Sequence, residues 1–534
     1  MEVLQNQQWL LSLGTFLPLA GVLVMLFIPK REEALVKGTA IVTAAATLLV
    51  GVYTLMQFDY GQSATQQFFT TNNWIRPIKA TYTVGLDGIS LPLYLLSMVI
   101  TLLVMVYSWD HVPSPGNPKA FFILMLVLQT GMAGTFVAQD LILFFVFFEL
   151  VLLPMYFMIG VWGGENRQYA SLKFFLYTMF GSALMLVSFI ALFVVSKNGL
   201  SPEVAAQASF KFQWFLQHGG GIAKNTAIWI FAGMFIGFAV KVPMFPFHTW
   251  LPDAHTEAPT QGSVILAAIL LKLGTYGFVR IALPFLPQAA VKWAPIIGVL
   301  AVIGIIYGAL GCLAQTDMKR LIAFSSVAHM GFVMLGISTL TTLGIDAALF
   351  GMVAHGLITG MLFFLAGSVK ERYHTLQIGR LSGMLKQMPR LGWILGFCAM
   401  ASLGLPGLAG FWGEFPAILS AYSPADGLSL TLFRTLMVVA AIGTVLAASY
   451  LLWLYQRTAF GEPTQEFSGH GGHAHAAGAA ANDEHRDDIH DVTIFEWIAW
   501  TPLLIAIVVF GVYPQLMFKI MDPAVDQLTA VFRK

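Results

Sequence analysis

Eight ionisable side chains lie inside stretches of the sequence that are otherwise apolar enough to cross a membrane. They are two glutamates, two lysines, one arginine and three histidines: Glu149, Lys241, His248, Lys272, Arg280, His329, His355 and Glu414. A charge at the centre of a membrane span costs at least about 2.5–3.5 kcal/mol, so each of these groups is a candidate functional residue. Carboxyl, amine and imidazole groups can exchange protons, and the pattern therefore predicts proton transfer within the membrane.

Glu149 lies in the run LILFFVFFELVLLPMYF, where every helical face is apolar, so a cation from another helix is expected beside it. Lys241, in the run AVKVPMFPFHTWLPDAHTE, is the natural partner. A neighbouring carboxylate and ammonium each favour the charged form of the other, so a change in their separation alters the proton affinity of both. We expect Glu149 and Lys241 to form such a coupling pair. The alternative is a static buried pair that only holds two helices together.

Lys272 follows Lys241 by one loop, so adjacent antiparallel helices would place the two amines at a similar depth. Like charges favour the neutral amine, and a lysine close to neutrality can take up and release protons. Arg280 lies further along the same span, nearer its end. A guanidinium keeps its proton, so Arg280 is expected to pair with an anion or to reach toward the membrane surface.

Three histidines and a second glutamate extend the series. His248 comes about two helical turns after the first lysine, whereas His329 and His355 lie in the middle of later spans. An imidazole suits a proton relay, although a single buried histidine is more often only a hydrogen-bonded core residue. Glu414 is expected to be the last proton carrier before the outer face. Asp140, at the start of a span, is expected to cap a helix rather than to carry protons.

Membrane-spanning helices must position these groups. Of the 534 residues, 57% are hydrophobic and only 10% are charged, well below the roughly 25% of soluble domains. Continuous apolar runs recur along the chain, unlike the alternating pattern of a β-barrel. We predict an all-α integral membrane protein with about 14 transmembrane helices. They cover residues 9–28, 38–58, 90–109, 120–137, 141–162, 172–195, 226–248, 260–283, 294–314, 321–338, 345–368, 391–420, 431–456 and 494–516.

Two of these helices are interrupted. The seventh contains Pro243 and Pro246, and the twelfth contains Pro406 among glycines in the sequence LGLPGLAGFWGEF. Proline removes a backbone hydrogen bond, so polar backbone is expected at membrane depth in both places. Broken helices in corresponding positions indicate two repeats around a polar site. Because each repeat would contain five helices, the second is expected to be inverted relative to the first.

The spans divide the chain into five regions. Residues 1–119 hold the first three helices, residues 120–283 and 284–460 the two repeats, residues 461–493 a polar loop, and residues 494–534 the last helix and tail. A histidine-rich loop can bind a metal ion, but this loop is rich in Gly and Ala, which favours a solvated segment without a metal. Its histidines are His470, His473, His475, His485 and His490.

Charged loops and cysteines limit what else the chain does. Lys and Arg, among them Lys319 and Arg372, are more frequent in the odd-numbered loops, which predicts that these loops face the cytoplasm. Only Cys312 and Cys398 are present, and neither a GxGxxG nor a GxxxxGK[ST] loop occurs. An iron–sulfur or nucleotide site cannot be built from this chain alone. No cofactor is expected here, and redox chemistry must take place in partner proteins.

Four stretches of the sequence, in this order, resemble a known family: FFVFFELVLLPMYFMIGVWGG, FAVKVPMFPFHTWLPDAHTEAPTQGSVILAAILLKLGTYGFVR, AQTDMKRLIAFSSVAHMGFV and SLGLPGLAGFWGEF. Over about residues 80–460 the chain resembles the antiporter-like membrane subunits of respiratory complex I (type I NAD(P)H dehydrogenase) and of its photosynthetic relative. The M-type, mitochondrial subunit-4-like member is the most similar. Sibling subunits usually carry lysine where Glu414 stands, so the glutamate favours the M type. The resemblance gives Glu414 the role of terminal proton carrier.

The resemblance implies fourteen helices with two inverted five-helix repeats and breaks in helices seven and twelve. It also implies roles for the other candidate residues. Glu149 and Lys241 would form the coupling pair, and Lys272 would be the central lysine. His329 and His355 would connect this lysine to the terminal carrier.

The function implied is proton translocation by a membrane subunit of a complex I type NAD(P)H or ferredoxin:quinone oxidoreductase, with flavin, iron–sulfur clusters and quinone in partner subunits. The expected partners are membrane subunits on both sides, the peripheral redox arm indirectly, and lipid, but no nucleic acid. The expected location is the bacterial inner membrane, or the thylakoid membrane in a photosynthetic lineage. Two alternatives are a subunit of a multi-subunit cation/proton antiporter and a structural membrane scaffold.

Overall fold

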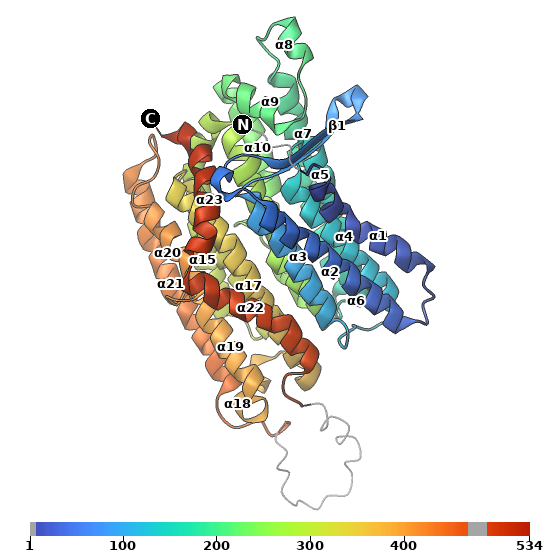
Figure 1. Cartoon of the computed structure of the whole chain (residues 1–534). Helices are drawn as coiled ribbons and strands as arrows, with labels where there is room; N and C mark the ends of the chain where they lie inside the picture. The colour runs from blue at the N-terminus through green and yellow to red at the C-terminus, as the bar shows by residue number, and fades with distance from the viewer. Residues whose placement is uncertain (1–6, 468–488, 534) are drawn as a thin grey trace, which may run out of the picture.

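The computed structural model describes residues 7–467 and 489–533, which form a bundle of long helices (Figure 1). Among these residues, 12 helices are long and apolar enough to cross a membrane. They are α1 (Leu10–Phe27), α2 (Glu33–Gln57), α3 (Ser90–Tyr107), α4 (Pro118–Val137), α5 with α6 (Leu141–Leu150 and Leu152–Trp162), α7 (Arg167–Val195), the segment from α12 to α14 (Thr260–Phe285), α15 (Pro287–Leu313), α16 (Met318–Ser338), α17 (Thr342–Tyr373), α21 (Leu430–Ala459) and α22 (Ile494–Val512). Each corresponds to a predicted span.

The two remaining predicted spans are the interrupted ones. The first consists of α10 (Lys224–Lys241) and α11 (Trp250–Glu257), and the second of α19 (Pro389–Ser402) and α20 (Ala409–Ser420). Pro243 and Pro406 lie in the two non-helical connections, so both predicted breaks are confirmed. Proline without a backbone N–H explains why neither helix continues through its connection.

A β-hairpin departs from the all-α expectation. Strands β1 (Gln67–Ile75) and β2 (Ala80–Leu86) pair in antiparallel fashion between α2 and α3. Both strands are rich in Thr and aromatic residues, which favour extended backbone. The hairpin lies at the same end of the bundle as the short helices α8 (Pro202–Ala206) and α9 (Phe212–His218), and we call this the hairpin end (Figure 1). The short α18 (Met384–Gln387) lies at the opposite end.

Two π-helical turns divide the segment Thr260–Phe285. The turns η4 (Leu266–Leu270) and η5 (Phe278–Ala282) separate α12 (Thr260–Ile265), α13 (Leu271–Gly277) and α14 (Leu283–Phe285). Such turns are frequent at functional sites, and these two flank Lys272. The described part of the chain also contains five short 3-10 turns: η1 (Tyr60–Gln62), η2 (Arg76–Ile78), η3 (Gly219–Gly221), η6 (Ile378–Arg380) and η7 (Ala530–Phe532).

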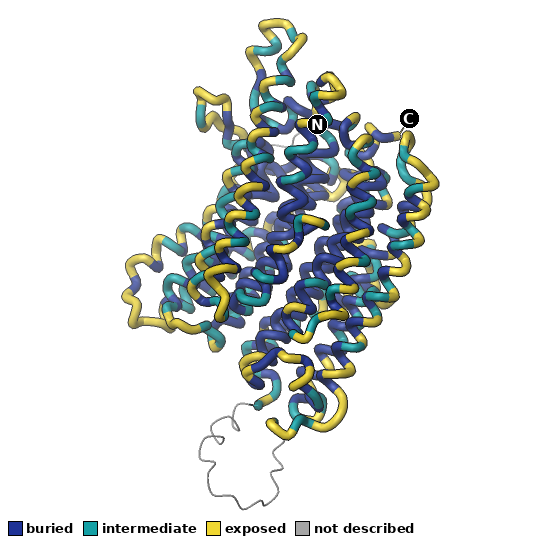
Figure 2. Tube along the Cα trace, turned by 180° about the vertical axis from the view of Figure 1, so that it is seen from behind, coloured by how far each residue is buried: buried dark blue, intermediate teal, exposed yellow. Residues whose placement is uncertain are grey.

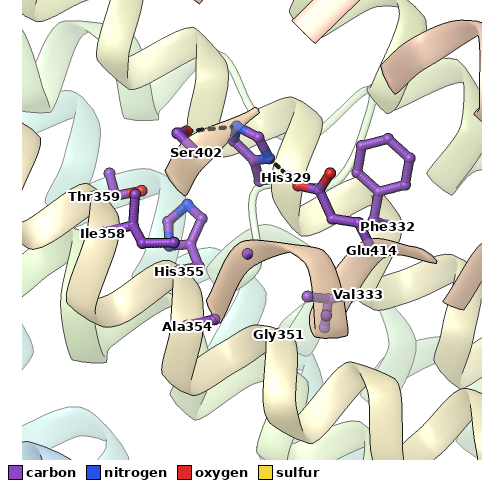
Figure 3. Close-up of a pocket in the computed structure, with 12 residues that line it drawn as sticks. His329, Phe332, Val333, Gly351, Ala354, His355, Ile358, Thr359, Ser402 and Glu414 are labelled. Atoms are coloured by element: carbon purple, nitrogen blue, oxygen red, sulfur yellow. Dashed lines mark hydrogen bonds and ion pairs between the residues drawn. The ribbon is translucent and has the colours of Figure 1, made fainter. Parts of the chain in front are cut away.

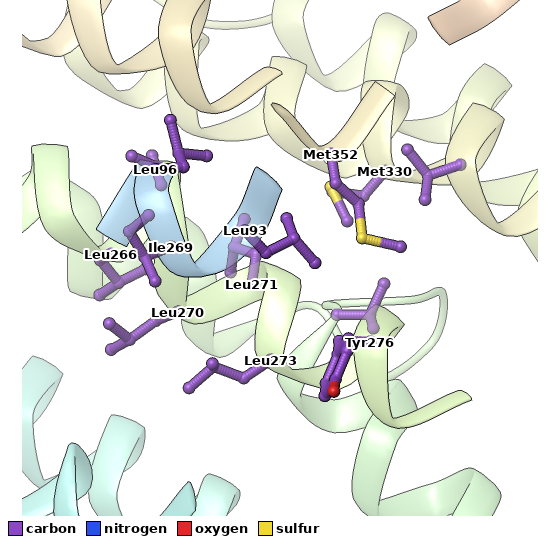
Figure 4. Close-up of a cluster of buried hydrophobic side chains, with 14 of the residues drawn as sticks. Leu93, Leu96, Leu266, Ile269, Leu270, Leu271, Leu273, Tyr276, Met330 and Met352 are labelled. Carbon is purple, nitrogen blue, oxygen red and sulfur yellow. The ribbon is translucent and has the colours of Figure 1, made fainter. Parts of the chain in front are cut away.

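The core of the bundle surrounds α17 and the segment Thr260–Phe285. The most apolar stretch of α17 is completely buried, whereas α1, α2 and α7 expose apolar side chains on the outside, where lipid or a neighbouring subunit can cover them (Figure 2). Apolar side chains of α3, η4, α16 and α17 fill the interior (Figure 4). The ionisable groups of the central helices are therefore surrounded by protein rather than by lipid.

The C-terminal helices hold α17 at both ends. The helix α23 (Gln515–Thr529) runs along the start of α17 at the hairpin end. The two helices run antiparallel, and contacts recur at every fourth residue of each. The contacting pairs are Phe350 with Phe518, Asp346 with Asp522, and Thr342 with Asp526. At the other end of α17, Arg372 Nη2 lies 2.7 Å from Glu496 Oε2 of α22.

Candidate functional site

Lys241 is the last residue of α10, and its side chain is buried. Its Nζ lies 4.8 Å from the centroid of the Phe148 ring and has no hydrogen-bond partner among the described residues. Glu149 follows Phe148 on α5, and its carboxylate and the Lys241 ammonium are close enough to attract each other. The hydroxyl of Ser182 lies beside the Glu149 carboxyl group. The two predicted partners thus attract each other electrostatically, but no direct ion pair or hydrogen bond joins them among the described residues.

Lys272 lies on α13 between the two π-helical turns. Its Nζ donates to the carbonyl oxygen of Ala267 at 2.5 Å and lies 2.7 Å from Nδ1 of His355 on α17. A Cβ placed on Gly274 would lie 3.0 Å from Cβ of Lys241, so α13 crosses α10 beside that lysine. The two lysines are therefore at neighbouring levels of the bundle, as expected for adjacent antiparallel helices.

His329 connects α16 to the second broken helix (Figure 3). Its Nδ1 lies 2.5 Å from Oε1 of Glu414 on α20. Its Nε2 lies 3.2 Å from the hydroxyl of Ser402, the last residue of α19, and 3.1 Å from the hydroxyl of Tyr450. Residues on both sides of the break thus contact one imidazole. The break at Pro406 leaves room for the carboxylate and the hydroxyl to approach the ring from different sides.

A small cavity separates the two histidines. The ring centroids of His329 and His355 are 6.0 Å apart, and both side chains line a cavity of about 20 Å³ together with Ser402, Thr359 and Glu414 (Figure 3). This volume accommodates about one water molecule, and the polar lining provides hydrogen-bond partners for it. A water there would bridge the rings. Lys272, His355, His329 and Glu414 then form a continuous series of groups that can pass a proton.

The supporting residues occupy separate places. His248 lies in the connection between α10 and α11 and packs against Tyr307, with ring centroids 4.8 Å apart, so it does not continue a helical face after Lys241. Arg280 pairs with Asp87, with Nη2 to Oδ1 at 2.5 Å, as the pairing hypothesis requires. Asp140 caps α5, as predicted, by accepting from the amides of residues 142 and 143. Burial raises the pKa of Asp140, and hydrogen bonds from Thr81 and from these amides oppose the rise.

Sequence reasoning missed several buried polar residues. His255 on α11 is fully buried, stacks on Phe363 at 4.4 Å, and has no hydrogen-bond partner for either ring nitrogen among the described residues. Lys319 and Arg372, which the sequence places in loops, are also buried. Lys319 is the second residue of α16 and donates to the carbonyl of Ala258. The sequence signal for Lys319 is weak, because the flanking charges in TDMKR are typical of a loop.

Metal binding is not supported by the described part of the chain. In residues 7–467 and 489–533, no group of three or more His, Cys, Asp or Glu side chains could hold a metal ion. Four of the five histidines of the polar loop, at positions 470, 473, 475 and 485, lie outside the described residues. The hypothesis of a histidine metal site therefore concerns residues that the structure does not describe.

Family models and curated relatives match this chain over nearly its whole length. The family model for "NADH:quinone oxidoreductase/Mrp antiporter, TM" matches residues 138–443, and the model for "NADH-ubiquinone oxidoreductase chain 4, amino terminus" matches residues 13–135. NADH-quinone oxidoreductase subunit M of Rhodobacter capsulatus is 38% identical over 98% of this chain and 96% of its own length. NAD(P)H-quinone oxidoreductase chain 4 3 of Trichormus variabilis is 36% identical over 97% and 91%.

Solved structures give the same result. A chain of respiratory complex I from Thermus thermophilus with bound NADH superposes with a TM-score of 0.82, at 27% identity, over 98% of this chain and 100% of that chain. A chain of the Mrp complex from Dietzia has a TM-score of 0.80 at 19% identity, over 98% of this chain and 52% of that chain, which shows only that the fold is similar.

Fold and site together define a multi-pass helical membrane protein of the antiporter-like class. The chain belongs to the NADH-quinone oxidoreductase subunit M (chain 4) family, the antiporter-like membrane subunits of complex I. It is therefore a subunit of the membrane arm of NADH-quinone oxidoreductase, a multi-subunit complex.

Proposed function

We propose that this subunit translocates protons through its buried Glu, Lys and His residues when partner subunits reduce quinone. The contacts that carry the proposal are those from Lys272 to His355, at 2.7 Å, and from His329 to Glu414, at 2.5 Å. Together with the cavity between the two rings, they connect the centre of the first half of the chain to the second broken helix. Glu149 and Lys241 precede this series and interact only electrostatically.

The energy enters, in this proposal, at Glu149 and Lys241. Lys241 lies directly before the break in its helix and attracts the Glu149 carboxylate without a direct ion pair, so a displacement of α5 or α10 changes their attraction. A weaker attraction lowers the proton affinity of Lys241 and drives a proton toward Lys272. From there it passes to His355, His329 and Glu414.

The same proposal specifies the membrane topology. The pairs α10 with α11 and α19 with α20 each complete one crossing, which gives fourteen crossings in two inverted five-helix repeats at residues 120–283 and 284–460. The hairpin end faces outward, because Lys and Arg are more frequent in the loops at the opposite end. Flavin, iron–sulfur clusters and quinone are bound by partner subunits. The membrane is the bacterial inner membrane, or the thylakoid membrane in a photosynthetic lineage.

The experiment measures proton movement per quinone reduced in the complete complex reconstituted in liposomes. Glu149→Ala and Lys241→Ala are expected to remove the proton movement that this subunit carries, because each leaves its partner without an adjustable counter-charge. Lys224→Ala is the matched control, because Lys224 is an exposed lysine at the other end of the same helix. Unchanged pumping in assembled Glu149→Ala and Lys241→Ala complexes would contradict the proposal.

Two other results would support the alternatives. Loss of assembly in both variants, with normal pumping in any complex that does assemble, would indicate a structural scaffold. Sodium-dependent proton exchange by a preparation without redox partners would indicate a cation/proton antiporter. The similarity to the Mrp complex does not favour the antiporter, because at 19% identity it concerns the fold alone.

A further inference from the structure

A cavity of about 270 Å³ lies at the hairpin end of the segment that carries Lys272. Five separate parts of the chain form its walls: residues before α3, Gln139 before α5, the helix α9, the segment from η5 to α14, and residues 524–531 after the middle of α23. Leu216 and Val531 line the cavity and are 41% and 55% exposed. The cavity therefore opens toward the surface at the hairpin end.

The polar wall of this cavity requires water. Gln139 lines it and is only 2% exposed, and neither polar atom of its amide group has a hydrogen-bond partner among the described residues. A buried amide without a partner is costly, whereas a cavity of this size holds several waters that can bond to it. We therefore treat the cavity as a hydrated vestibule, connected to the water outside.

The inner wall of the vestibule carries an ion pair. Arg280 Nη2 lies 2.5 Å from Oδ1 of Asp87, and both residues line the cavity. The Asp87 carboxylate also accepts from Gln66 Nε2 at 2.7 Å and from the amides of Ile89 and Ser90 at 3.1 Å. Its oxygens are thus already occupied by donors. The guanidinium is held in one place and is not deprotonated in proteins.

Only two helical turns separate this ion pair from the proposed relay. Lys272, Tyr276 and Arg280 follow at intervals of four residues, which places them on one side of the helix, and the ends of this series are about 12 Å apart along the axis. The Tyr276 hydroxyl donates to the carbonyl of Phe136 at 2.8 Å and accepts from Arg280 Nε at 3.2 Å. Tyr276 and Arg280 together therefore close the path from the vestibule to the lysine.

We propose that Arg280, held in place by Asp87, is a proton seal between the vestibule and Lys272. A fixed positive charge repels an incoming proton, and cationic groups exclude protons from water-filled pores in this way. The inference rests on the proposed function, since a seal is required only if Lys272 carries protons. Arg280 takes no part in the transfer itself. It prevents a second, uncoupled route from Lys272 to the water at the hairpin end.

The test measures passive proton conductance of the complete complex in liposomes, with no quinone reduction taking place. Arg280→Met is expected to raise the conductance by about tenfold or more. A tenfold change corresponds to about 1.4 kcal/mol, and removal of one nearby charge changes the energy of a proton by more than that. Arg280→Lys keeps the charge and is expected to remain tight. Arg434→Met is the matched control, because Arg434 is exposed at the same end and its guanidinium lies against Tyr422, away from the vestibule lining.

A double variant separates the seal from a purely structural ion pair. Arg280→Met with Asp87→Asn removes both charges, so no unpaired charge is buried, and the complex should assemble even if the single variant does not. If the pair only held the helices together, the double variant would be as tight as the wild type, and this result would overturn the proposal. The proposed seal predicts instead that the double variant conducts protons.

A second combination connects the leak to the relay. Adding Lys272→Ala to Arg280→Met is expected to return the conductance to the wild-type level. A leak that persists in this variant would overturn the assignment of Lys272 as the group behind the seal, and so would a tight, assembled Arg280→Met complex. Conductance is measured without turnover, so its outcome is distinct from the pumping result for Glu149→Ala, which tests the relay itself.

Discussion

Replacing Gly413 by alanine provides a sharp steric test of the proposed relay. Gly413 precedes Glu414 on α20 and faces Gly351 on α17. A Cβ at Gly413 would lie 2.5 Å from Cα of Gly351, whereas ordinary contacts are 3.4–4 Å. Backbone atoms cannot rotate away as a flexible side chain can, so α20 and α17 must separate by about 1 Å.

A shift of this size is enough to break the contact between Glu414 and His329. The distance from Nδ1 to Oε1 is 2.5 Å, and an added 1 Å takes it to the limit of a hydrogen bond. A hydrogen bond to a charged group contributes about 1.5–3 kcal/mol, which corresponds to a factor of about 10 to 150 in the population of the connected state. Gly413→Ala is therefore expected to lower the proton movement through this subunit by about tenfold or more.

The assay is the ratio of protons moved to quinone reduced in the reconstituted complex. Gly38→Ala is the control, because it makes the same change within a helix where a Cβ meets nothing within 4 Å. Glu414→Gln removes the charge without changing the helix spacing and should lower the ratio similarly. An assembled Gly413→Ala complex with an unchanged ratio, alongside a low ratio for Glu414→Gln, would refute the reasoning about helix spacing.

Two further predictions concern the contacts of α17 with the C-terminal helices. Arg372→Met removes the arginine partner of the fully buried Glu496 and should cost about 3–5 kcal/mol, seen as a lower Tm of the complex, whereas adding Glu496→Gln should restore most of it. An unchanged Tm for Arg372→Met would contradict this. Burial raises the pKa of Asp522, which hydrogen-bonds to Asp346. The folded state therefore holds a proton more tightly than a free carboxyl group does. As a result, the docking of α23 weakens as the pH rises above the usual range of aspartate. Hydrogen exchange of residues 515–529 should increase as the pH rises above the usual range of aspartate, beyond its intrinsic pH dependence, and Asp522→Asn should remove the excess. An equal excess in that variant would exclude Asp522 as the cause.

The sequence alone predicts the helical spans, the two breaks and the ionisable residues, because apolar length, proline and intramembrane charge each act locally. It does not predict the β-hairpin, since short polar strands between two long apolar runs resemble a loop. It also misses the burial of Lys319, which depends on a carbonyl at Ala258 far away in the chain. The contact of Tyr450 with His329 likewise joins residues 121 positions apart. Tertiary packing decides such contacts, so composition and spacing cannot reveal them.

The long helix α17 is attached to other helices near both of its ends. Its 32 residues extend about 48 Å, with His355 near the middle and attachments to α22 and α23 near its two ends. Because a helix is stiff, a displacement of one end of α17 is transmitted to its other end. The C-terminal helices therefore help to fix the position of the central histidine, although none of the proposed relay residues lies on them, and a neighbouring protein that displaces them would shift that histidine from a distance.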